Sequence, residues 1–418
     1  MNFTNYLLLT AYNLSIRLYG FIVNVASFFK PKAKQWIEGR KNWQSNFKAI
    51  LKPNEKRIWV HAASLGEFEQ GRNLIEAFKK DYPAYKIVLT FFSPSGYEVR
   101  KNYEHADYIF YLPLDTKTNA GDFVQLINPS LAVFVKYEFW YHYLNTLHQK
   151  NIPTIIISAA FRKEQPFFKW YGGLFRKMLN CFTAIFVQDE ASKQLLQSIN
   201  INKNIIVAGD TRYDRVLTIA SNKKQLPLIE TFINNQPTLI AGSSWQDDEK
   251  IIQQSFNALP ENWKLIIAPH EIGKDRIDEV LSLFPDAILY SNLNNSITDK
   301  RILIIDNIGM LSSLYSYGKI AFVGGGFQKG GIHNILEPAV FGLPVLFGPV
   351  YQKFVEARLL VDKQLCFSIS SADECKAVLT RLSADERYFQ SVHQSLVGFM
   401  KEQAGATNAV LDFIRLSL

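Results

Sequence analysis

The stretch "FVGGGFQKGGIHNILEPAVFGLPVLFGP", residues 322–349, shows how this chain is built. The apolar run from Lys319 to Val323 predicts a buried strand, and the run from Val345 to Phe347 predicts the next one. The glycines between them allow positive φ and let a ligand approach the main chain closely. They are Gly324, Gly325, Gly326, Gly330 and Gly331. Glycine-rich turns are also common in α/β folds, but the length of this loop and its paired glycines favour a ligand loop.

A helix is predicted between the loop and the second strand. Asn334 suits an N-cap, and Glu337, three residues later, suits its capping partner. Gly342 and Pro344 are expected to end this helix. The free N–H groups and the positive dipole of a helix N-terminus favour an anion. The glycine spacing fits neither the GxGxxG nor the Walker pattern, so no dinucleotide or NTP motif is inferred.

Apolar runs typical of strands alternate with helical patterns along the whole chain. They lie at residues 58–62, 86–91, 108–112, 131–135, 154–158, 184–187, 205–208, 238–241, 264–268, 288–290, 302–305, 320–323 and 345–347. This alternation predicts doubly wound parallel sheets. The pattern weakens at residues 221–236, and 418 residues exceed one ordinary core. We therefore expect two Rossmann-like halves with a ligand in the cleft between them.

The composition narrows the class of partner. The chain has 46 Lys and Arg residues against 38 Asp and Glu residues, and its formal net charge of +8 favours an anionic surface or substrate. No run of six like charges indicates a nucleic-acid tail. Cys181, Cys366 and Cys375 have no metal or redox spacing, and we interpret them as reduced thiols in a cytosolic environment.

The N-terminal stretch differs from the rest of the chain. Between Met1 and Phe29 the only charged side chain is Arg17, which shares a narrow polar face with Asn and Ser residues on a helical wheel. Basic residues follow this stretch: Lys30, Lys32, Lys34, Arg40 and Lys41. The pattern predicts an in-plane amphipathic helix or a short membrane anchor, with the following domain on the cytoplasmic side. The alternative is a helix packed on the first domain. A secretory signal is not favoured, because the basic residues follow the apolar ones.

Two predicted strand ends in the first half carry acids. Ser64 and Glu67 follow the strand at 58–62 with the spacing of a capping box. Glu67 would also lie at the edge of the cleft, where a carboxylate can act as general base, and the pattern leaves both roles open. Glu138 follows the strand at 131–135, and Arg212 lies at the predicted domain junction.

In the second half, Ser243 and Ser244 follow a strand and precede a helix that begins with three acids. Hydroxyl and N–H groups there can meet a phosphate or simply cap the helix. Pro269 and His270 follow the next strand, and a lone histidine is more often structural than catalytic. No DxD-type pair follows a strand to hold a divalent metal against a diphosphate, which favours a site without metal.

Four segments together resemble the Kdo transferases of lipopolysaccharide synthesis, where Kdo is 3-deoxy-D-manno-oct-2-ulosonic acid. They are "HAASLGE" at 61–67, "YEFW" at 137–140, "AGSSWQDDE" at 241–249 and the glycine stretch at 322–349. The resemblance covers nearly the whole chain. It implies an α/β protein of GT-B fold, with two Rossmann-like doubly wound parallel-sheet domains, a cleft between them and an N-terminal membrane-associating helix.

The expected division is a membrane-anchor or amphipathic helix at 1–35, an acceptor domain at 36–215 and a CMP-sugar donor domain at 216–418. The family moves Kdo from CMP-Kdo to a lipid A precursor with inversion, at the cytoplasmic face of the inner membrane. The expected partners are therefore CMP-Kdo, the lipid A precursor and the membrane surface, with no nucleic acid. No cofactor and no metal are expected, since CMP-Kdo carries a single phosphodiester.

The resemblance also implies roles for residues. Glu67 would be the catalytic base, and Glu138 and Arg212 would assist the transition state. Residues implied to hold CMP are Pro269, His270, Ile308, Gly309, Met310, Asn334, Ile335, Leu336 and Glu337, and Ser243, Gly325 and Gly326 of the predicted ligand loops join them. Glu337 would accept hydrogen bonds from the ribose hydroxyls. The chain departs from the family pattern at Lys136, where relatives have an acid, and at Arg212, where they have a lysine.

Two other functions fit the same patterns. The first is another GT-B enzyme that acts on a UDP-sugar, either a transferase or an epimerase. Tight binding of UDP without binding of CMP would favour it. The second is a non-catalytic nucleotide-sugar binder attached to the membrane, which sugar transfer from CMP-Kdo would exclude.

Overall fold

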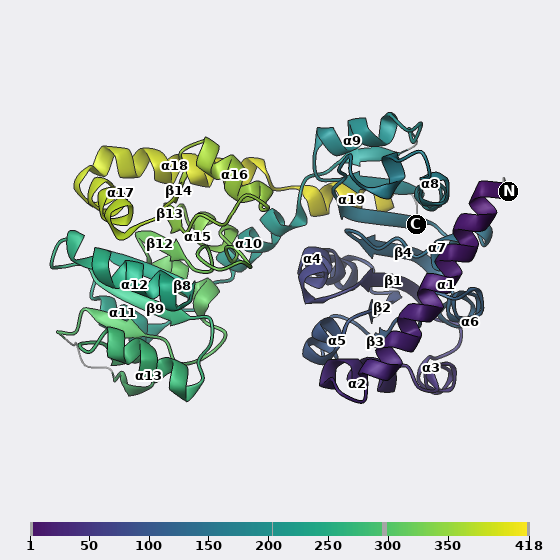
Figure 1. Ribbon diagram of the computed structural model, residues 1–418, viewed down its shortest axis with the longest axis horizontal. Helices are drawn as coiled ribbons and strands as arrows, with labels where there is room; N and C mark the ends of the chain where they lie inside the picture. The colour runs from purple at the N-terminus through teal and green to yellow at the C-terminus, as the bar shows by residue number, and fades with distance from the viewer. Residues whose placement is uncertain (1–2, 203, 295–298, 416–418) are drawn as a thin grey trace. The chain divides into compact units, whose positions relative to one another are not determined.

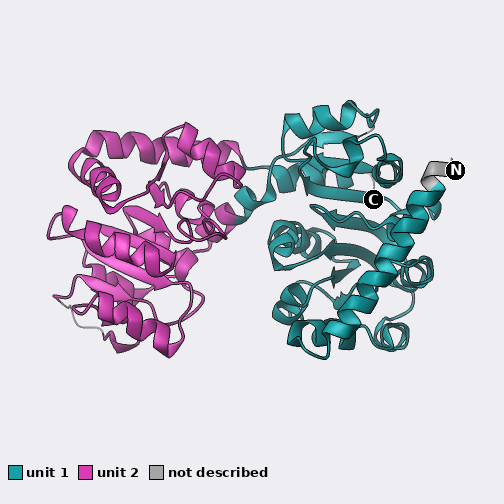
Figure 2. Cartoon of the chain, viewed as in Figure 1, with its two compact units in different colours: residues 1–215, 404–418 teal, residues 216–403 magenta. Residues whose placement is uncertain are grey.

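The structure is a computed structural model that describes residues 3–202, 204–294 and 299–415. The chain divides into two compact units (Figures 1 and 2). Unit 1 comprises residues 1–215 and 404–418, and unit 2 comprises residues 216–403. Each unit is Rossmann-like, with helices packed on one parallel sheet. The predicted GT-B fold class is confirmed.

Unit 1 contains a seven-stranded sheet in the order β3-β2-β1-β4-β5-β6-β7, and all neighbouring strands are parallel. The strands are β1 (Lys56–Ala62), β2 (Tyr85–Phe91), β3 (Tyr108–Tyr111), β4 (Pro129–Val135), β5 (Thr154–Ala159), β6 (Ala184–Val187) and β7 (Ile205–Val207). Strands β2 and β3 extend the sheet on one side of β1, and β4 to β7 extend it on the other. The switch point of this doubly wound sheet therefore lies between β1 and β4, where ligands bind in such folds.

Helices cover both faces of this sheet because alternate side chains of a strand point to opposite faces. On β1, Trp59 packs in one hydrophobic core, whereas Ile58 and Val60 pack in the other. The helices of unit 1 are α1 (Phe3–Ala26), α2 (Pro31–Glu38), α3 (Trp43–Ile50), α4 (Leu65–Asp81), α5 (Pro94–Arg100), α6 (Lys117–Ile127), α7 (Tyr141–Gln149), α8 (Gly173–Asn180), α9 (Glu190–Gln197) and α19 (Ala406–Arg415). Helix α10 (Thr211–Ser221) leads into unit 2.

Unit 2 repeats the architecture with the strand order β10-β11-β9-β8-β12-β13-β14. Its strands are β8 (Thr238–Ser244), β9 (Lys264–Pro269), β10 (Ile288–Leu289), β11 (Ile302–Ile304), β12 (Ile320–Val323), β13 (Val345–Phe347) and β14 (Cys366–Ser368). Its helices are α11 (Pro227–Ile233), α12 (Gln246–Ser255), α13 (Lys274–Leu283), α14 (Leu311–Leu314), α15 (Leu336–Ala339), α16 (Val355–Asp362), α17 (Ala372–Ala384) and α18 (Glu386–Glu402). Here the switch point lies between β8 and β12.

The strands predicted from the apolar runs are present, and β14 is an additional one. The helix predicted after Asn334 is shorter than expected, because α15 spans only Leu336–Ala339. Its short length leaves little helix dipole, so the predicted anion site at its N-terminus loses part of its physical basis.

The C-terminal helix corrects the predicted domain boundary. The sequence placed all of residues 216–418 in the donor domain, but α19 belongs to unit 1 (Figure 2). Its apolar side chains Val410, Leu411 and Ile414 enter the core that covers one face of the first sheet. Asp214 also accepts hydrogen bonds from the N–H groups of Gly405 and Thr407, both at 2.6 Å. Burial of this apolar face explains why the chain returns to unit 1.

Helix α1 packs along unit 1, with one face partly buried and the other exposed. The Tyr12 hydroxyl donates a hydrogen bond to Asp115 at 2.5 Å, and His142 Nε2 lies 2.6 Å from the Asn13 side-chain oxygen. Large apolar side chains on the opposite face are exposed: Tyr6, Leu7, Leu14, Leu18, Phe21, Ile22 and Val25. Residues Tyr6–Ala26 are also long and apolar enough to cross a membrane, by length and composition alone. The expected segment 1–35 is part of unit 1 and not a separate body.

Candidate functional site

The acids predicted in the first half flank the switch point of unit 1. Glu67 lies in the first turn of α4, directly after β1. Glu138 lies in the loop between β4 and α7. Since β1 and β4 are neighbouring parallel strands, their carboxyl ends lie at one edge of the sheet. The topology therefore brings two carboxylates from distant parts of the sequence to the same edge.

Glu67 is held by the residue that precedes its helix. Ser64 occupies the N-cap position of α4 in an extended conformation, and its hydroxyl donates a hydrogen bond to Glu67 Oε2. The Ser64 side chain makes no hydrogen bond to the helix backbone, so the pair is not a reciprocal capping box. Glu67 is partly exposed. One carboxylate oxygen is thus positioned by a neighbour, and the group remains accessible from solvent.

Glu138 is buried and has two hydrogen-bond donors on one oxygen. Its Oε2 accepts from Trp140 Nε1 at 2.6 Å and contacts His61 Nε2 at 3.0 Å. His61 Nδ1 lies 2.9 Å from the Thr90 hydroxyl, which accepts from Trp59 Nε1 at 2.8 Å. With its proton on Nε2, His61 donates to Glu138 and accepts from the Thr90 hydroxyl, and its Nδ1 also lies 3.2 Å from the Thr90 carbonyl oxygen. The network holds the Glu138 carboxylate rigidly at the end of β4.

His61 is a site residue that the sequence reasoning did not select. It is fully buried in β1, where the rest of the strand is largely apolar. A polar ring inside an apolar strand was a usable signal, since buried polar groups need partners. Its partner, Glu138, lies 77 residues away in the sequence, so only the folded chain reveals the pair.

The loop that carries Glu138 begins with a strained residue. Lys136 directly follows β4 and has φ of +67°, a region that non-glycine residues enter at a cost of about 1–2 kcal/mol. Burial raises the pKa of the next residue, Tyr137. The charges of Arg162 and Arg212 nearby oppose this rise but do not cancel it. Arg212 forms an ion pair with Asp210, from Nη2 at 2.7 Å. The predicted basic helper is therefore fixed by an acid two residues before it.

The donor-site residues predicted in the second half lie at one edge of the unit 2 sheet. They follow the neighbouring strands β11, β9, β8 and β12. Ser243, the penultimate residue of β8, has φ of +53°, Pro269 ends β9, and His270 donates its N–H to the Ser244 carbonyl at 3.0 Å. Residues 308–310 lie in the loop after β11, where Ile308 is exposed and Met310 is buried.

The glycines after β12 are explained by main-chain packing. A Cβ atom on Gly324 would lie 2.3 Å from the Ser243 carbonyl oxygen, and one on Gly326 would lie 2.4 Å from the Gly348 nitrogen. Gly325 is buried with them and has φ of +91°. Only beyond this tight part, at Gly330, is the space around the position open. The close approach that glycine permits here is between two segments of this chain.

Asp248 ties the glycine loop to the N-terminus of α12. Its Oδ2 accepts from the N–H groups of Trp245 at 2.9 Å and Gly325 at 2.8 Å. Its other oxygen, Oδ1, is buried without a hydrogen-bond partner. Burial raises the pKa of Asp248 to about 6, against the lowering effect of the two N–H donors. This carboxyl group therefore connects both sides of the unit 2 switch point.

Three aromatic side chains stack at this edge. His270 lies 4.8 Å from the Trp245 ring and 4.3 Å from the His333 ring, measured between centroids. Trp245 Nε1 donates to His333 Nε2 at 3.2 Å. Burial, and then the neighbouring His270, lower the pKa of His333 to about 4, so this ring is neutral at pH 7. Sequence reasoning did not select His333 or Trp245, since their stacking with His270 depends on the fold.

The predicted Asn334–Glu337 pair is present in an altered form. Asn334 Oδ1 accepts from the Leu336 N–H at 3.1 Å, and its amide donates to Glu337 Oε1 at 3.0 Å. The side chains of Ile335 and Leu336 are buried, so they can offer a ligand only main-chain groups. Glu337 also raises the pKa of the buried Tyr315 hydroxyl by its charge, after burial itself.

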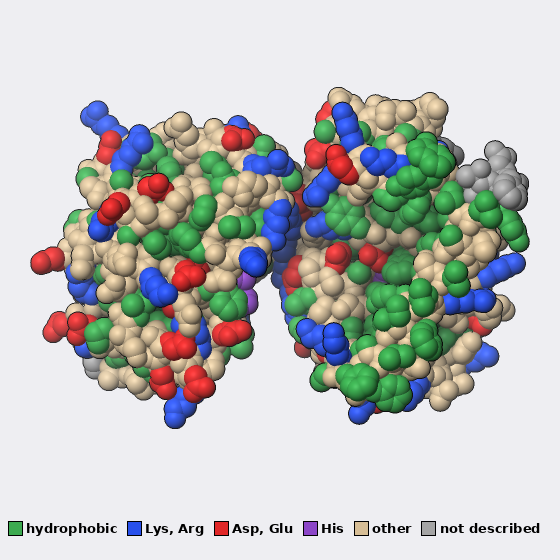
Figure 3. Space-filling model, in the orientation of Figure 1, with side chains coloured by type: hydrophobic (Ala, Val, Ile, Leu, Met, Phe, Trp, Pro, Cys, Tyr) green, Lys and Arg blue, Asp and Glu red, His purple; other side chains and the backbone are tan. Residues whose placement is uncertain are grey.

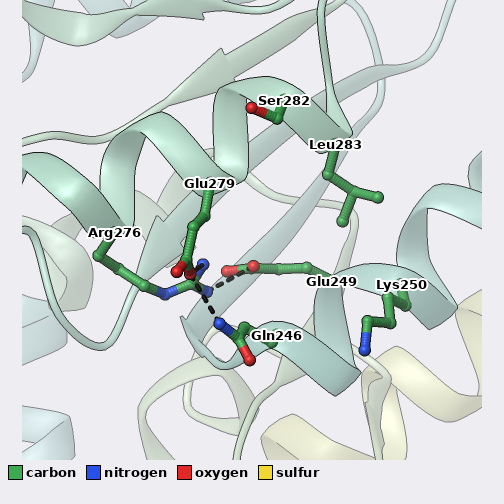
Figure 4. A pocket seen from close by; sticks show the side chains of 7 residues that line it. All are labelled: Gln246, Glu249, Lys250, Arg276, Glu279, Ser282 and Leu283. Atoms are coloured by element: carbon green, nitrogen blue, oxygen red, sulfur yellow. Dashed lines mark hydrogen bonds and ion pairs between the residues drawn. The ribbon is translucent and has the colours of Figure 1, made fainter.

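A cavity of about 410 Å³ lies between α12 and α13, and it contains none of the predicted site residues (Figure 4). Within it, Arg276 forms ion pairs with the buried Glu249 at 2.5 Å and with Glu279 at 3.4 Å. Glu249 also accepts a hydrogen bond from the Ser244 hydroxyl at 2.7 Å. Through the hydrogen bond from Ser244 to Glu249, this cluster stabilises the turn at Ser243–Ser244. Among the residues that the structure describes, no group of three or more His, Cys, Asp or Glu side chains could hold a metal ion.

Known proteins similar to this chain include transferases. Residues 41–215 match the sequence family described as 3-deoxy-D-manno-octulosonic-acid transferase (kdotransferase). The chain is 26% identical over 409 residues to the 3-deoxy-D-manno-octulosonic acid transferase of Haemophilus influenzae, with 94% of each protein covered. It is 29% identical over 370 residues to a bifunctional glycosyltransferase/methyltransferase of Fusobacterium nucleatum subsp. nucleatum, covering 84% of this chain but only 56% of that relative.

Among solved structures, the UDP-GlcNAc 2-epimerase of Neisseria meningitidis bound to UDP-GlcNAc is similar, with a TM-score of 0.60 and 17% sequence identity. The match covers 86% of this chain and 99% of the epimerase. At this identity the likeness shows the fold alone. The fold is thus of the GT-B class, and the sequence relatives are a Kdo transferase and a bifunctional glycosyltransferase/methyltransferase.

Proposed function

We propose that this chain transfers Kdo from CMP-Kdo to a lipid A precursor, because residues 41–215 match the kdotransferase family model and the chain is similar to a Kdo transferase along most of its length. The observation that carries the proposal is the placement of Glu67 and Glu138 on either side of the unit 1 switch point. Ligands of doubly wound sheets bind at such points.

In the proposed reaction, a hydroxyl oxygen of the acceptor attacks the anomeric carbon of Kdo. Glu67 takes the hydroxyl proton, the bond from the anomeric carbon to the phosphate oxygen breaks, and CMP leaves from the opposite face with inversion. Ser64 donates to one oxygen of Glu67, so the accessible carboxylate keeps a defined orientation. Glu138 and Arg212 are proposed to stabilise the charge that develops on the sugar and the phosphate.

The donor is proposed to bind at the carboxyl edge of unit 2. Its CMP would meet the main chain at residues 334–337 and the exposed His270 ring, and Glu337 would accept hydrogen bonds from the ribose. We propose that no metal takes part, because a single phosphodiester leaves as CMP without a chelated diphosphate. Transfer is expected to be unchanged by EDTA, and a loss of activity that Mg²⁺ restores would contradict this.

We propose that the protein works on the cytoplasmic face of the inner membrane, with α1 lying in the membrane surface. The partly buried contacts of Tyr12 and Asn13 hold one face of α1 against unit 1 and leave the apolar face for lipid. A helix held in this way is suited to an in-plane position.

The test is incubation of the purified full-length protein with CMP-Kdo and a lipid A precursor in mixed micelles, followed by mass spectrometry of the lipid. The expected product is the precursor carrying Kdo, with release of CMP. A parallel reaction receives UDP-GlcNAc in place of CMP-Kdo. Conversion of UDP-GlcNAc with an unchanged lipid in the CMP-Kdo reaction would replace the proposal with a UDP-sugar enzyme.

A further inference from the structure

A second cavity in unit 1, of about 530 Å³, lies beneath the C-terminal half of α1. Helix α1, helix α2 with the turn after it, and the segment that leads from β3 into α6 form its walls. Its polar lining comes from Arg17, Asn24, Arg40 and Asn119, whereas Phe21, Trp36 and others provide an apolar lining. The site is therefore amphiphilic, and both of its charged side chains are positive.

Arg40 has no acidic partner in the parts of the chain that the structure describes. Its guanidinium donates to three carbonyl oxygens, those of Leu112 at 2.8 Å, Trp36 at 3.0 Å and Phe92 at 2.7 Å. It also lies over the Trp36 ring, 3.8 Å from the centroid. Burial lowers the pKa of Arg40 to about 9, and only tyrosine hydroxyls oppose this.

These contacts leave Arg40 with unused hydrogen-bonding capacity. A guanidinium has five N–H donors, and three are used here, one on each nitrogen. One N–H remains on Nη1 and one on Nη2, and guanidinium N–H groups form strong charge-assisted hydrogen bonds to phosphate or carboxylate oxygens. A partly buried cation without a counter-charge is stabilised when an anion enters the cavity.

Arg17 provides the second positive charge. It projects from α1 into the cavity lining, is exposed, and forms no ion pair among the described residues. It is also the only charged side chain in residues 1–29. A single charge on an otherwise apolar helix, placed over a cavity that already contains Arg40, indicates a function in binding.

The cavity is connected to the proposed catalytic edge by aromatic rings. The Trp36 ring lies 5.6 Å from Phe92, and Phe92 lies 4.7 Å from Trp140, between centroids. Trp140 in turn donates to Glu138. This row of rings leads from Arg40 to the carboxylate at the end of β4.

On the other side, the cavity borders the apolar face of α1. Phe21 of α1, and Phe28 and Phe29 in the turn after it, are exposed to 65%, 78% and 82%. Hydrophobic side chains also gather on the face of unit 1 that α1 crosses (Figure 3). The cavity thus lies between a surface suited to acyl chains and an edge suited to sugar chemistry.

We propose that this cavity binds the phosphorylated headgroup of the lipid acceptor, with Arg17 and Arg40 on one phosphate and the acyl chains along the exposed face of α1. The inference rests on the proposed function for the identity of the acceptor. A volume of about 530 Å³ suits one phosphorylated sugar unit and not a whole glycolipid. The apolar lining favours a lipid-linked phosphate over free inorganic phosphate.

The test measures binding of the full-length protein to phosphatidylcholine vesicles of three kinds. One contains a phosphorylated lipid A precursor, one contains the same glycolipid after enzymatic dephosphorylation, and one contains phosphatidylglycerol at matched surface charge. Arg17→Gln is the main variant, because Arg17 is exposed and its loss leaves the core intact. Lys32→Gln is the matched control, since it removes an equal exposed charge outside the cavity.

The wild-type protein is expected to prefer the phosphorylated precursor over both other vesicles. Arg17→Gln is expected to lose about tenfold in affinity for that precursor, the effect of one charge-assisted hydrogen bond, and little for the other two. Arg40→Lys keeps the charge without the paired N–H groups, so it is expected to lose the same preference if its melting temperature is unchanged. Lys32→Gln is expected to weaken binding to all anionic vesicles equally.

The readout separates this inference from the catalytic one. Selective binding that depends on Arg17, without any transfer of Kdo, would support the cavity and refute the proposed reaction. Transfer of Kdo with an unchanged KM for acceptor in Arg17→Gln, and equal binding of this variant and wild type to the phosphorylated precursor, would overturn the cavity. Equal wild-type affinity for phosphatidylglycerol and the precursor would also overturn it.

Discussion

Glu67 combines a local structural contact with an open carboxylate. Ser64 donates to one of its oxygens, and a glutamine at position 67 can accept that bond equally well. Glutamine cannot take a proton from an acceptor hydroxyl. The two roles that the sequence left open, capping and catalysis, are therefore separable by one substitution.

Glu67→Gln is expected to melt within a few degrees of the wild type and to bind CMP normally, yet to transfer Kdo about 10²–10⁴-fold more slowly, the usual loss of a general base. Transfer rates at saturating donor and acceptor, with melting curves from the same preparations, provide the measurement. Wild-type turnover in this variant would exclude Glu67 as the base, and Glu138→Gln would be the next variant to test.

Asp248 shows how a buried acid makes stability depend on pH. Its folded pKa of about 6 lies above the usual aspartate value of 3.8, because burial penalises the charged form. The folded state therefore binds more protons, and this contribution to stability is complete below about pH 4 and is lost as the pH rises through about 6. Once Asp248 has lost its proton, Oδ1 is a buried, charged oxygen without a hydrogen-bond partner.

Asp248→Asn keeps one oxygen for the N–H groups of Trp245 and Gly325 and removes the titration. The free energy of unfolding of this variant, relative to wild type, is expected to rise by about 2 kcal/mol between pH 4 and pH 6.5, from the pKa shift. Calorimetry can measure this free energy from the unfolding transition of unit 2. That transition is identified as the one that CMP is expected to shift. A difference that stays constant with pH would show that Asp248 does not titrate in this range.

At the scale of elements, helix α1 has two faces with different requirements. The inner face is fixed by Tyr12 and Asn13, so deletion of the whole helix would also uncover part of the core of unit 1. Substitution of exposed side chains on the outer face tests membrane association without that side effect.

The triple variant Phe21→Ser, Phe28→Ser and Phe29→Ser is expected to leave the melting temperature unchanged, because these side chains are exposed in the folded protein. It is also expected to release the protein from vesicles, because each aromatic side chain contributes about 1.5–3 kcal/mol when it is buried in lipid. Sedimentation with vesicles measures this. Val355→Ser, an exposed apolar position in unit 2, is the matched control and should sediment like wild type. Equal sedimentation of the triple variant would refute a role for this face in membrane binding.

At the scale of the molecule, the chain crosses between the units twice, through α10 and again before α19. The second crossing returns the ten-residue helix α19 to complete the core of unit 1. A protein truncated after Gln403 therefore lacks part of unit 1, although the missing residues lie at the far end of the sequence.

This truncation is expected to destabilise unit 1 by about 4–9 kcal/mol, since Val410, Leu411 and Ile414 each contribute about 1.5–3 kcal/mol by burial. Unit 2 is expected to keep its CMP affinity. Urea unfolding and CMP titration of the truncated and full-length proteins provide the comparison. Unfolding of unit 1 at the same urea concentration in both would show that α19 adds nothing to its stability.

The sequence by itself determined the elements that depend on local patterns. Short apolar runs predicted the strands, their alternation with helical patterns predicted two doubly wound sheets, and motif residues such as Glu67 and Glu138 were found because each follows a strand directly. These features are encoded within about ten residues, so neighbouring side chains are sufficient to predict them. The strand β14 escaped because Cys366–Ser368 is too short to form a recognisable run.

Only the tertiary structure decided which distant residues meet. His61 reaches Glu138, Trp245 and His270 reach His333, Arg40 lies over a cavity without an acid, and α19 returns to unit 1. Each of these contacts joins segments that are far apart in the sequence. Which segments meet depends on the order of the strands and on which apolar faces the neighbouring elements leave uncovered. The physical reason is that hydrophobic burial is non-directional, so a local pattern specifies that a face must be covered, and the packing of the whole chain selects the segment that covers it.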